Sequence, residues 1–376
     1  MKKSILLLLT TALLLCLFSG CGKKAEPQTP PSSSAPTETA ATETRIITDG
    51  VGRQVELPAV VSTIVPLCNT PRMITYLGLA DKVVGIEQCE HATSPIMAYA
   101  YVNIERWKEL PNVGNNALGA SEWYAEELVA CAPDVILCNY DKDTADSIQR
   151  QTGIPTVAVS QGTLFGEDYK ESLRILADVC GVSERAELLI SFIDECLLDL
   201  EGRTKSLSDE NKPLVLGAGA TFKGGHSIDG VYSNYPVFSI LSANDAAVGI
   251  SDTIGGLLVD KEQILAWDPD MIFFDSGSME LVKTDYAADS AYFNQLKAVK
   301  NGELYQWPNS TWHWSNVEIP LVSCYYVGTL LYPEAFADVD FEAKAAEIFE
   351  IFLGEPDYLS VLEQAGAGYG KVSLGS

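Results

Sequence analysis

The chain has 376 residues, 47% of them hydrophobic, which is enough for two or more globular units of ordinary size. Its 51 Asp and Glu against 25 Lys and Arg give a net charge of −26. A protein this acidic repels phosphate backbones, so the composition argues against a nucleic-acid partner. The sequence also lacks a phosphate-binding glycine loop, a zinc-protease motif and a nucleophile elbow, which are signatures of common enzyme classes.

Residues 1–20 have the layout of a secretion signal peptide. A basic start precedes an apolar run from Ile5 to Phe18, and two small residues precede Cys21. The run is about 14 residues long, too short for a permanent membrane span. The Ser-Gly-Cys ending resembles the lipobox of bacterial lipoproteins, which implies lipidation of Cys21 after the signal is removed. An ordinary signal peptide with a Cys there by chance is the alternative.

Residues 21–44 are predicted to form a disordered tether that starts at the lipidated Cys21. After this Cys, Ala supplies the apolar side chains, and Pro, Ser and Thr are abundant. Such a segment cannot bury enough apolar surface to offset its ordering entropy. We therefore expect it to hold a globular body away from a membrane.

From residue 45 onward, short apolar runs alternate with amphipathic stretches. A hairpin is predicted at residues 45–57, with Asp49 and Gly50 at its turn. Two sets of strands are predicted after it: residues 62–67, 82–86, 134–138 and 156–160, then residues 214–217, 271–274 and 303–306. This alternation predicts two α/β lobes with mainly parallel sheets, at residues 45–165 and 211–376.

Residues 166–210 are predicted to connect the two lobes through helices. The longest helix begins at an N-capping Ser183 and extends to about Leu207. About 25 residues would span about 37 Å, long enough for a rigid rod between the lobes. A short coiled-coil seam is the alternative. The apolar residues recur at helical spacing, at Ala186, Leu189, Ile190, Ile193, Leu197 and Leu200.

An internal repeat relates the two lobes. Residues 125–137 and 261–273 each contain a Glu that opens a short helix, a Pro-Asp pair that ends it, and an apolar strand. The repeat places Glu126 and Glu262 at equivalent positions, eight residues before the Asp of each pair. Two such matches at corresponding places predict two related lobes.

Several segments in a fixed order resemble the substrate-binding proteins of ABC importers for ferric siderophores, haem and cobalamin. The resemblance implies a class III periplasmic-binding-protein-like fold, in which a single long helix bridges two Rossmann-like lobes. It extends over about residues 45–375 and is carried by residues 47–58, 71–86, 110–114, both Pro-Asp repeats and residues 292–305. Residues 331–340 and 352–354 resemble a subset that includes binders of iron complexes and other metal chelates.

The resemblance also implies a function without covalent chemistry. A ferric siderophore, haem, cobalamin or other metal complex would be captured between the lobes and delivered to a permease dimer driven by a separate ATPase. The protein would be extracytoplasmic and lipid-anchored to the bacterial cell membrane, with no cofactor. The alternatives are a secreted hydrolase that uses His226 or His313, and a sensory or metallochaperone lipoprotein that binds the same ligand without delivering it.

Ligands of open parallel sheets bind beyond the carboxyl ends of the strands. An exposed aromatic loop gains most from a ligand or partner, so residues 312–314 are the strongest candidate. No set of Met, His or Tyr shows the spacing of metal ligands. The candidate ligand-binding residues are Asn69, Thr70, Arg72, Tyr140, Thr221, His226, Ser276, Trp312, His313 and Trp314. The alternatives are that Trp312 and Trp314 pack the second lobe and that Arg72 lies on a helix surface.

Glu126 and Glu262 carry the predicted contacts with the permease. In the family that this chain resembles, one exposed Glu per lobe docks onto Arg residues of the two permease subunits. Two separated charge contacts would fix the orientation of the complex and speed encounter. The alternative is that both are ordinary carboxylates favoured by the positive end of a helix dipole.

Overall fold

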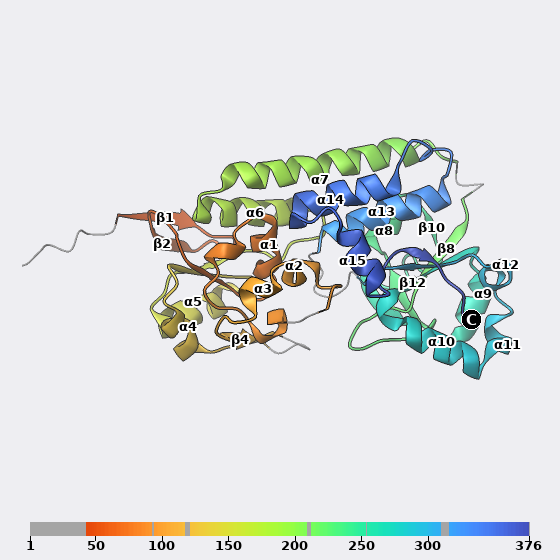
Figure 1. Ribbon diagram of the computed structural model, residues 1–376, viewed down its shortest axis with the longest axis horizontal. Helices are drawn as coiled ribbons and strands as arrows, with labels where there is room; N and C mark the ends of the chain where they lie inside the picture. Colours follow the sequence, from red (N-terminus) through yellow and green to blue (C-terminus); the bar gives the residue numbers. More distant parts are fainter. Residues whose placement is uncertain are drawn as a thin grey trace, which may run out of the picture. The chain divides into compact units, whose positions relative to one another are not determined.

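The computed structural model describes residues 43–91, 94–116, 121–208, 212–252, 254–309 and 316–375. The predicted signal peptide, Cys21, the tether up to residue 42 and the loop at residues 312–314 lie outside this part of the chain. Within it, no helix is both long and apolar enough to cross a membrane. Figure 1 follows the chain from its N-terminal lobe in orange and yellow, through green helices, to its C-terminal lobe in cyan and blue.

The N-terminal lobe is built on a parallel sheet with the strand order β3–β6–β7. These strands confirm three predicted runs, whereas residues 82–86 do not form a strand. Val83 pairs with Ile64 and Ile86 pairs with Asn112, so this segment changes partner after three residues and no ladder extends along it. The elements are β1 (Thr44–Thr48), β2 (Gln54–Pro58), β3 (Ile64–Pro66), α1 (Thr70–Tyr76), α2 (Ala98–Tyr101), α3 (Ile104–Trp107), β4 (Gly114–Asn115), β5 (Glu122–Trp123), α4 (Ala125–Cys131), β6 (Val135–Cys138), α5 (Lys142–Thr152) and β7 (Thr156–Ala158).

The C-terminal lobe contains a mixed sheet with the strand order β11–β9–β8–β12–β13–β14, and β10 lies beside β8. Strands β8, β12 and β13 are parallel and confirm the predicted runs. The sequence did not predict β9 and β11, because Gly and Ser interrupt their apolar pattern. The elements are β8 (Leu214–Ala218), β9 (Gly230–Ser233), α8 (Pro236–Ile240), β10 (Asn244–Asp245), β11 (Gly255–Leu258), α9 (Lys261–Trp267), β12 (Met271–Asp275), α10 (Met279–Ala288), α11 (Ser290–Phe293), α12 (Lys297–Asn301), β13 (Leu304–Trp307), α13 (Glu318–Leu331), α14 (Phe341–Leu353), α15 (Tyr358–Gln364) and β14 (Gly370–Lys371).

Helix α7 (Ser183–Thr204) is the predicted long helix, and it follows α6 (Glu167–Cys180). Its 22 residues span about 33 Å, and it ends three residues before the predicted end. The predicted N-cap is wrong by one position, because Val182 is the cap and Ser183 already lies in the helix. The predicted apolar face packs into the chain's own core, which excludes a coiled-coil seam there.

The internal repeat is also a structural repeat. Helices α4 and α9 each end at a residue in the left-handed conformation, with φ of 47° and 44°. The carboxylate of Asp134 then accepts a hydrogen bond from the backbone N–H of Thr63 (2.9 Å), at the start of β3. In the other lobe the carboxylate of Asp270 accepts one from Leu214 (2.8 Å), at the start of β8. The two lobes therefore share the same helix end and the same hydrogen bond between an Asp carboxylate and the start of a strand.

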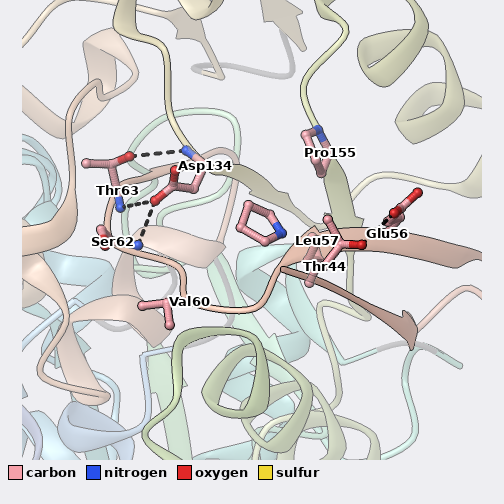
Figure 2. Close-up of a pocket in the computed structure, with 9 residues that line it drawn as sticks. Thr44, Glu56, Leu57, Val60, Ser62, Thr63, Asp134 and Pro155 are labelled. Carbon is pink, nitrogen blue, oxygen red and sulfur yellow. Dashed lines mark hydrogen bonds between the residues drawn. The ribbon is translucent and has the colours of Figure 1, made fainter. Parts of the chain in front are cut away.

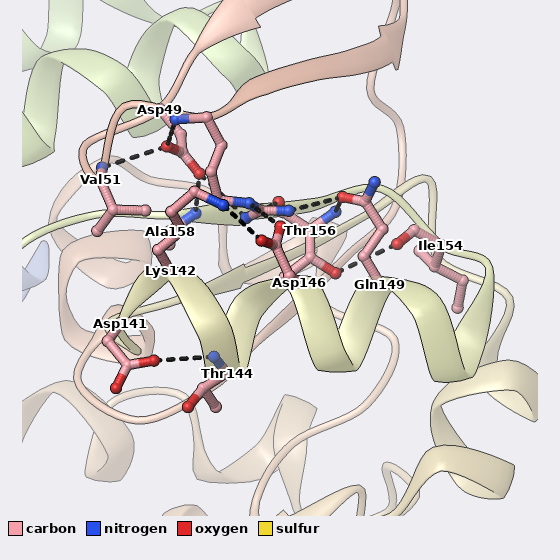
Figure 3. A network of polar contacts seen from close by, with 11 residues as sticks. Asp49, Val51, Asp141, Lys142, Thr144, Asp146, Gln149, Ile154, Thr156 and Ala158 are labelled. Atoms are coloured by element: carbon pink, nitrogen blue, oxygen red, sulfur yellow. Dashed lines mark hydrogen bonds and ion pairs between the residues drawn. The ribbon is translucent and has the colours of Figure 1, made fainter.

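Strands β1 and β2 form the predicted antiparallel hairpin, and Arg53 fastens it to the N-terminal lobe. The Arg53 guanidinium donates to the carboxylates of Asp49 (3.1 Å) and Asp146 (2.7 Å). It also donates to Gln149 Oε1 (2.9 Å), and these three acceptors are seen together in Figure 3. Because Asp49 and Arg53 are both buried, the Asp49 carboxylate depends on Arg53 for charge compensation.

The two lobes share an apolar core. The largest cluster of buried apolar side chains includes residues of both lobes and of α7. At the junction, Tyr76 of α1 donates a hydrogen bond to the carboxylate of Glu318 in α13, and both side chains are fully buried. Arg185 of α7 donates to the backbone carbonyls of Tyr76 (2.9 Å) and Ile351. These polar contacts join helices that belong to different lobes.

Candidate functional site

The carboxyl ends of β8 and β12 meet at a buried carboxylate, Asp275. Its Oδ2 accepts hydrogen bonds from the hydroxyls of Thr221 (3.0 Å) and Tyr232 (2.5 Å). Its Oδ1 accepts a hydrogen bond from the backbone N–H of Gly277 (2.8 Å). Burial raises the pKa of Asp275 to about 6, although these hydrogen bonds favour the charged form. Asp275 thereby orients two hydroxyls at the edge of the sheet where a ligand is expected.

Asn309 links the predicted residues of this lobe to one another. Its side-chain amide donates to Thr221 Oγ1 (2.7 Å), and its backbone N–H donates to Ser276 Oγ (3.2 Å). Thr221 and Ser276, which the sequence predicts separately, therefore lie in one cluster. The predicted aromatic loop at residues 312–314 follows this cluster in the sequence but lies outside the described residues.

His226 lies against an aromatic side chain of the same lobe. Its ring centroid is 4.2 Å from that of Phe222, with 30° between the planes, and its Nε2 donates to the Phe222 carbonyl (2.9 Å). Two glycines provide the space for this pair. A Cβ at Gly230 would lie 2.4 Å from His226 Cβ, and a Cβ at Gly256 would lie 2.3 Å from Phe222 Cδ1. His226 is half-buried, so part of its side chain remains accessible.

Arg72 and Asn69 belong to the junction between the lobes. The Arg72 guanidinium donates to Asn69 Oδ1 and to the Tyr99 hydroxyl (3.2 Å) within its own lobe. A third hydrogen bond reaches Asn316 Oδ1 (3.2 Å), which precedes α13 of the other lobe. Arg72 has no exposed surface, so the alternative of a helix-surface Arg is wrong. Its role as a ligand clamp stays a prediction.

Thr70 and Tyr140 differ in accessibility. Thr70 is fully buried, and its hydroxyl donates to the carbonyls of Leu67 (2.8 Å) and Leu137 (3.1 Å). These bonds join the end of β3 to β6, and the role of Thr70 in ligand binding stays a prediction. Tyr140 is half-buried, its ring centroid lies 6.0 Å from that of Trp123, and burial raises the pKa of its hydroxyl. Tyr140 therefore has accessible surface that Thr70 lacks.

A buried carboxylate also lies beside the strand ends of the N-terminal lobe. Glu87 has no exposed surface, and its Oε2 accepts a hydrogen bond from the backbone N–H of Cys68 (2.5 Å). Cys68 has a φ of 61°, a left-handed conformation that is uncommon for a residue with a Cβ. This hydrogen bond gives the buried backbone N–H of Cys68 a partner in this conformation. Each lobe thus has a buried acidic residue beyond the carboxyl ends of its strands, Glu87 in one and Asp275 in the other.

Sequence reasoning missed Asp275, Glu87 and Asn309. Each follows a predicted apolar run within three residues, so a search for polar residues directly after buried runs would have found all three. The partners of Asp275 carry no local signal, because Tyr232 is 43 positions away in the sequence.

Glu126 and Glu262 occupy equivalent places in the two lobes. They lie in the first turns of α4 and α9, and both are exposed. Neither carboxylate has a hydrogen-bond or ion-pair partner in the part of the chain that the structure describes. Both are therefore accessible to an external cation.

Figure 2 shows a hollow at the opposite edge of the N-terminal sheet. Its lining includes Ser62, Thr63 and Asp134, which directly precede β3 and β6. It therefore lies at the amino ends of these strands, and we assign it no ligand. The described residues also contain no group of three or more His, Cys, Asp or Glu placed to hold a metal ion.

Solved structures share this arrangement of two α/β lobes and a long connecting helix. A periplasmic solute-binding protein of Veillonella parvula is 22% identical, with a TM-score of 0.66 over 83% of this chain and 93% of that one. The molybdate periplasmic binding protein MolA of Haemophilus influenzae is 18% identical, with a TM-score of 0.64 over 82% and 98%. The periplasmic haem-binding protein HutB of Vibrio cholerae is 16% identical, with a TM-score of 0.54 over 72% and 99%. These similarities confirm the predicted fold class.

The chain belongs to the periplasmic binding protein family. The sequence model of the periplasmic binding protein family matches residues 72–311, well over half of the chain. No curated protein matches the sequence. Members of this family are periplasmic binding proteins, so the protein is an extracytoplasmic solute-binding protein and not an enzyme, which removes the hydrolase alternative.

Proposed function

We propose that this protein captures an iron–siderophore complex or a related metal chelate between its two lobes and delivers it to an ABC permease. The observation that carries this proposal is the polar cluster at the carboxyl ends of the C-terminal sheet, where the buried Asp275 orients the hydroxyl of the half-buried Thr221. The N-terminal lobe offers Tyr140, which has accessible surface, at its own strand ends. Hydroxyls and aromatic rings together suit a bulky ligand with a polar periphery.

The cargo of the structural neighbours supports a metal-containing ligand. MolA is described as bound to molybdate, and HutB is described as a haem-binding protein. Molybdate is a metal oxyanion and haem is an iron chelate, so both ligands contain a metal. The resemblance of residues 331–340 to metal-chelate binders points to the same class of ligand for this chain.

A titration of the purified chain tests the ligand class. The probes are a ferric hydroxamate, a ferric catecholate, haem, cobalamin and molybdate, and the signal is tryptophan fluorescence. We expect one of these complexes to bind with one-to-one stoichiometry and a Kd of about 1 µM or tighter. Binding of none of them, or tight binding of a metal-free sugar or amino acid in a parallel titration, would contradict the proposed ligand class.

The same titration tests the aromatic loop. We propose that Trp312, His313 and Trp314 contact the ligand, because Asn309 of the polar cluster lies just before them in the sequence. Replacing all three with Ala should weaken binding at least tenfold, about 1.4 kcal/mol, and leave the thermal transition of the unliganded protein in place. Unchanged affinity would assign these side chains to packing of the lobe.

Lipidation of Cys21 is part of the proposal. The signal-like residues 1–20 and the polar segment that follows support an N-terminal lipid anchor. Membrane attachment would keep the binding protein close to its permease and raise its effective concentration there.

Docking through Glu126 and Glu262 is the last part of the proposal. Both carboxylates are exposed and occupy repeat-related positions, which suits a permease made of two similar subunits. Charged contacts of this kind mainly set the orientation and the rate of encounter.

A further inference from the structure

Exposed apolar side chains gather beside β11, the edge strand of the C-terminal sheet. Val248 is 63% exposed, Ile250 40%, Ile254 44% and Leu258 57%. Ile250 and Leu258 line a hollow together with Leu257 and Trp267. We name these six side chains the β11 surface. Exposed apolar groups that cluster in this way mark surfaces that a partner covers.

The loop that carries part of this surface is held in place by Asn234. The Asn234 side-chain amide donates to the carbonyl of Ser251 (2.8 Å), and its Oδ1 accepts from the backbone N–H of Gly249 (2.9 Å). Ile250 lies between these two anchored residues. The part of the loop that carries Ile250 is therefore ordered by the protein itself, which lowers the entropy cost of binding there.

Strand β11 also offers a free backbone edge. It pairs with β9 on one side, and among the described residues it is the outermost strand at that edge of its sheet. Its sequence, Gly-Gly-Leu-Leu, contains none of the charges or prolines that usually protect an edge strand. An extended segment of a partner can add to such an edge through main-chain hydrogen bonds.

The rim of the β11 surface is acidic. Asp229 and Asp260 line the hollow, and Glu262 is exposed in the next turn of the chain. Lys261 does not offset them, because its ammonium forms an ion pair with Asp285 (2.8 Å). A partner that fits this surface therefore combines apolar and basic side chains. A second copy of this chain, with a net charge of −26, repels such a rim.

We propose that the β11 surface docks an extended, apolar and basic extracytoplasmic segment of the permease, next to the contact at Glu262. This inference rests on the proposed function and adds an apolar anchor to it. The strand also contacts the candidate ligand side of the lobe, because Gly256 of β11 packs directly under the Phe222 ring, which stacks on His226. The docked segment and the loop that carries His226 thus contact the same strand.

Introducing a charge into the apolar β11 surface tests this inference. The variants are Leu258→Asp and the combination Ile250→Asp with Leu258→Asp, and Leu258→Ser serves as a milder change. Leu198→Asp is the matched control, because Leu198 is an exposed leucine (72%) on α7, away from this surface. Association is measured with the cognate permease–ATPase complex in nanodiscs, and metal-chelate affinity and the thermal transition are measured in solution.

The β11 variants should associate with the permease at least about tenfold more weakly than the wild type, while Leu198→Asp stays within about twofold. Chelate affinity and the thermal transition should not change. If the wild type associates and the β11 variants associate equally well, the inference is wrong and the proposed function stands. If the wild type does not associate with the permease, the inference and the proposed function both fail. Self-association that only the β11 variants lose, with unchanged permease association, would assign the surface to a second copy and overturn the inference.

Discussion

Two carboxylates without exposed surface, Glu87 and Asp275, lie beside the strand ends of the two lobes. A buried carboxylate costs free energy unless hydrogen bonds satisfy it. Asp275 receives hydrogen bonds from Thr221, Tyr232 and Gly277. In return it holds the two hydroxyls in fixed directions, so the candidate ligand side of the lobe is already ordered without a ligand.

Asp275 predicts a specific pH dependence of stability. Its pKa in the folded protein, about 6, lies above the ordinary value of 3.8, so the folded state binds this proton more tightly than the unfolded state. The contribution of protonated Asp275 to the unfolding free energy is fully present below about pH 4, and it is lost as the pH rises towards about 6. Between these values, the wild type should lose on the order of 2 kcal/mol more unfolding free energy than Asp275→Asn.

Urea unfolding at pH 4 and pH 6.5 measures this difference. Asp245, whose pKa burial also raises to about 6, is present in both proteins and cancels in the comparison. If the unfolding free energies of the wild type and of Asp275→Asn change with pH in the same way, the assignment of a raised pKa to Asp275 is contradicted.

Among the elements, the β1–β2 hairpin depends on one side chain. Arg53→Ala should lower the unfolding free energy by about 3 kcal/mol, because it leaves the buried carboxylate of Asp49 without its cation. Arg45→Ala is the matched control in the same hairpin. Its partner Asp178 is largely exposed, so the loss should stay below about 1 kcal/mol. Equal losses in urea unfolding for the two variants would contradict the special role of Arg53.

The sequence predicted the elements that have a strong local period. The face of α7 and the two Pro-Asp repeats follow from spacing alone, and the structure confirms both. Residues 82–86 were predicted as a strand because they are apolar, but pairing depends on partners that local sequence does not specify. Strands β9 and β11 were missed because their glycines serve close packing, such as Gly256 against Phe222.

The candidate site was predictable to a similar extent. The strand-end rule of parallel sheets led to Thr221 and Ser276, which the structure joins through Asn309. It could not show that Arg72 is buried, because the hydrogen bond to Asn316 spans 244 positions of sequence. Thr70 was included for the same topological reason, but its hydroxyl is used inside the sheet.

For the whole molecule, the proposed membrane attachment depends on one residue. Cys21→Ser should abolish lipidation, so that the protein is released from the membrane or keeps its signal peptide. Cys16→Ser, within the apolar run, is the matched control and should behave like the wild type. Detergent partitioning and the mass of the mature N-terminus measure both outcomes. A processed Cys21→Ser protein that partitions like the wild type would rule out the anchor.

The proposed docking involves both lobes. The double variant Glu126→Ala with Glu262→Ala should weaken association with the permease by about tenfold and reduce uptake, since it removes one charge contact from each lobe. Ligand affinity in solution should stay the same, because these carboxylates are exposed and lack partners among the described residues. A control that removes the exposed Glu127 and Glu280 should have little effect. Normal uptake by the first double variant would contradict the docking role.

The most direct test of delivery is the ATPase activity of the permease complex in nanodiscs, measured with chelate-loaded and with unloaded protein. We expect the loaded protein to stimulate ATP hydrolysis and to release its metal complex, since transport couples ligand delivery to the ATPase. Tight chelate binding in solution combined with unchanged ATP hydrolysis at saturating protein would contradict delivery and indicate a ligand sensor instead.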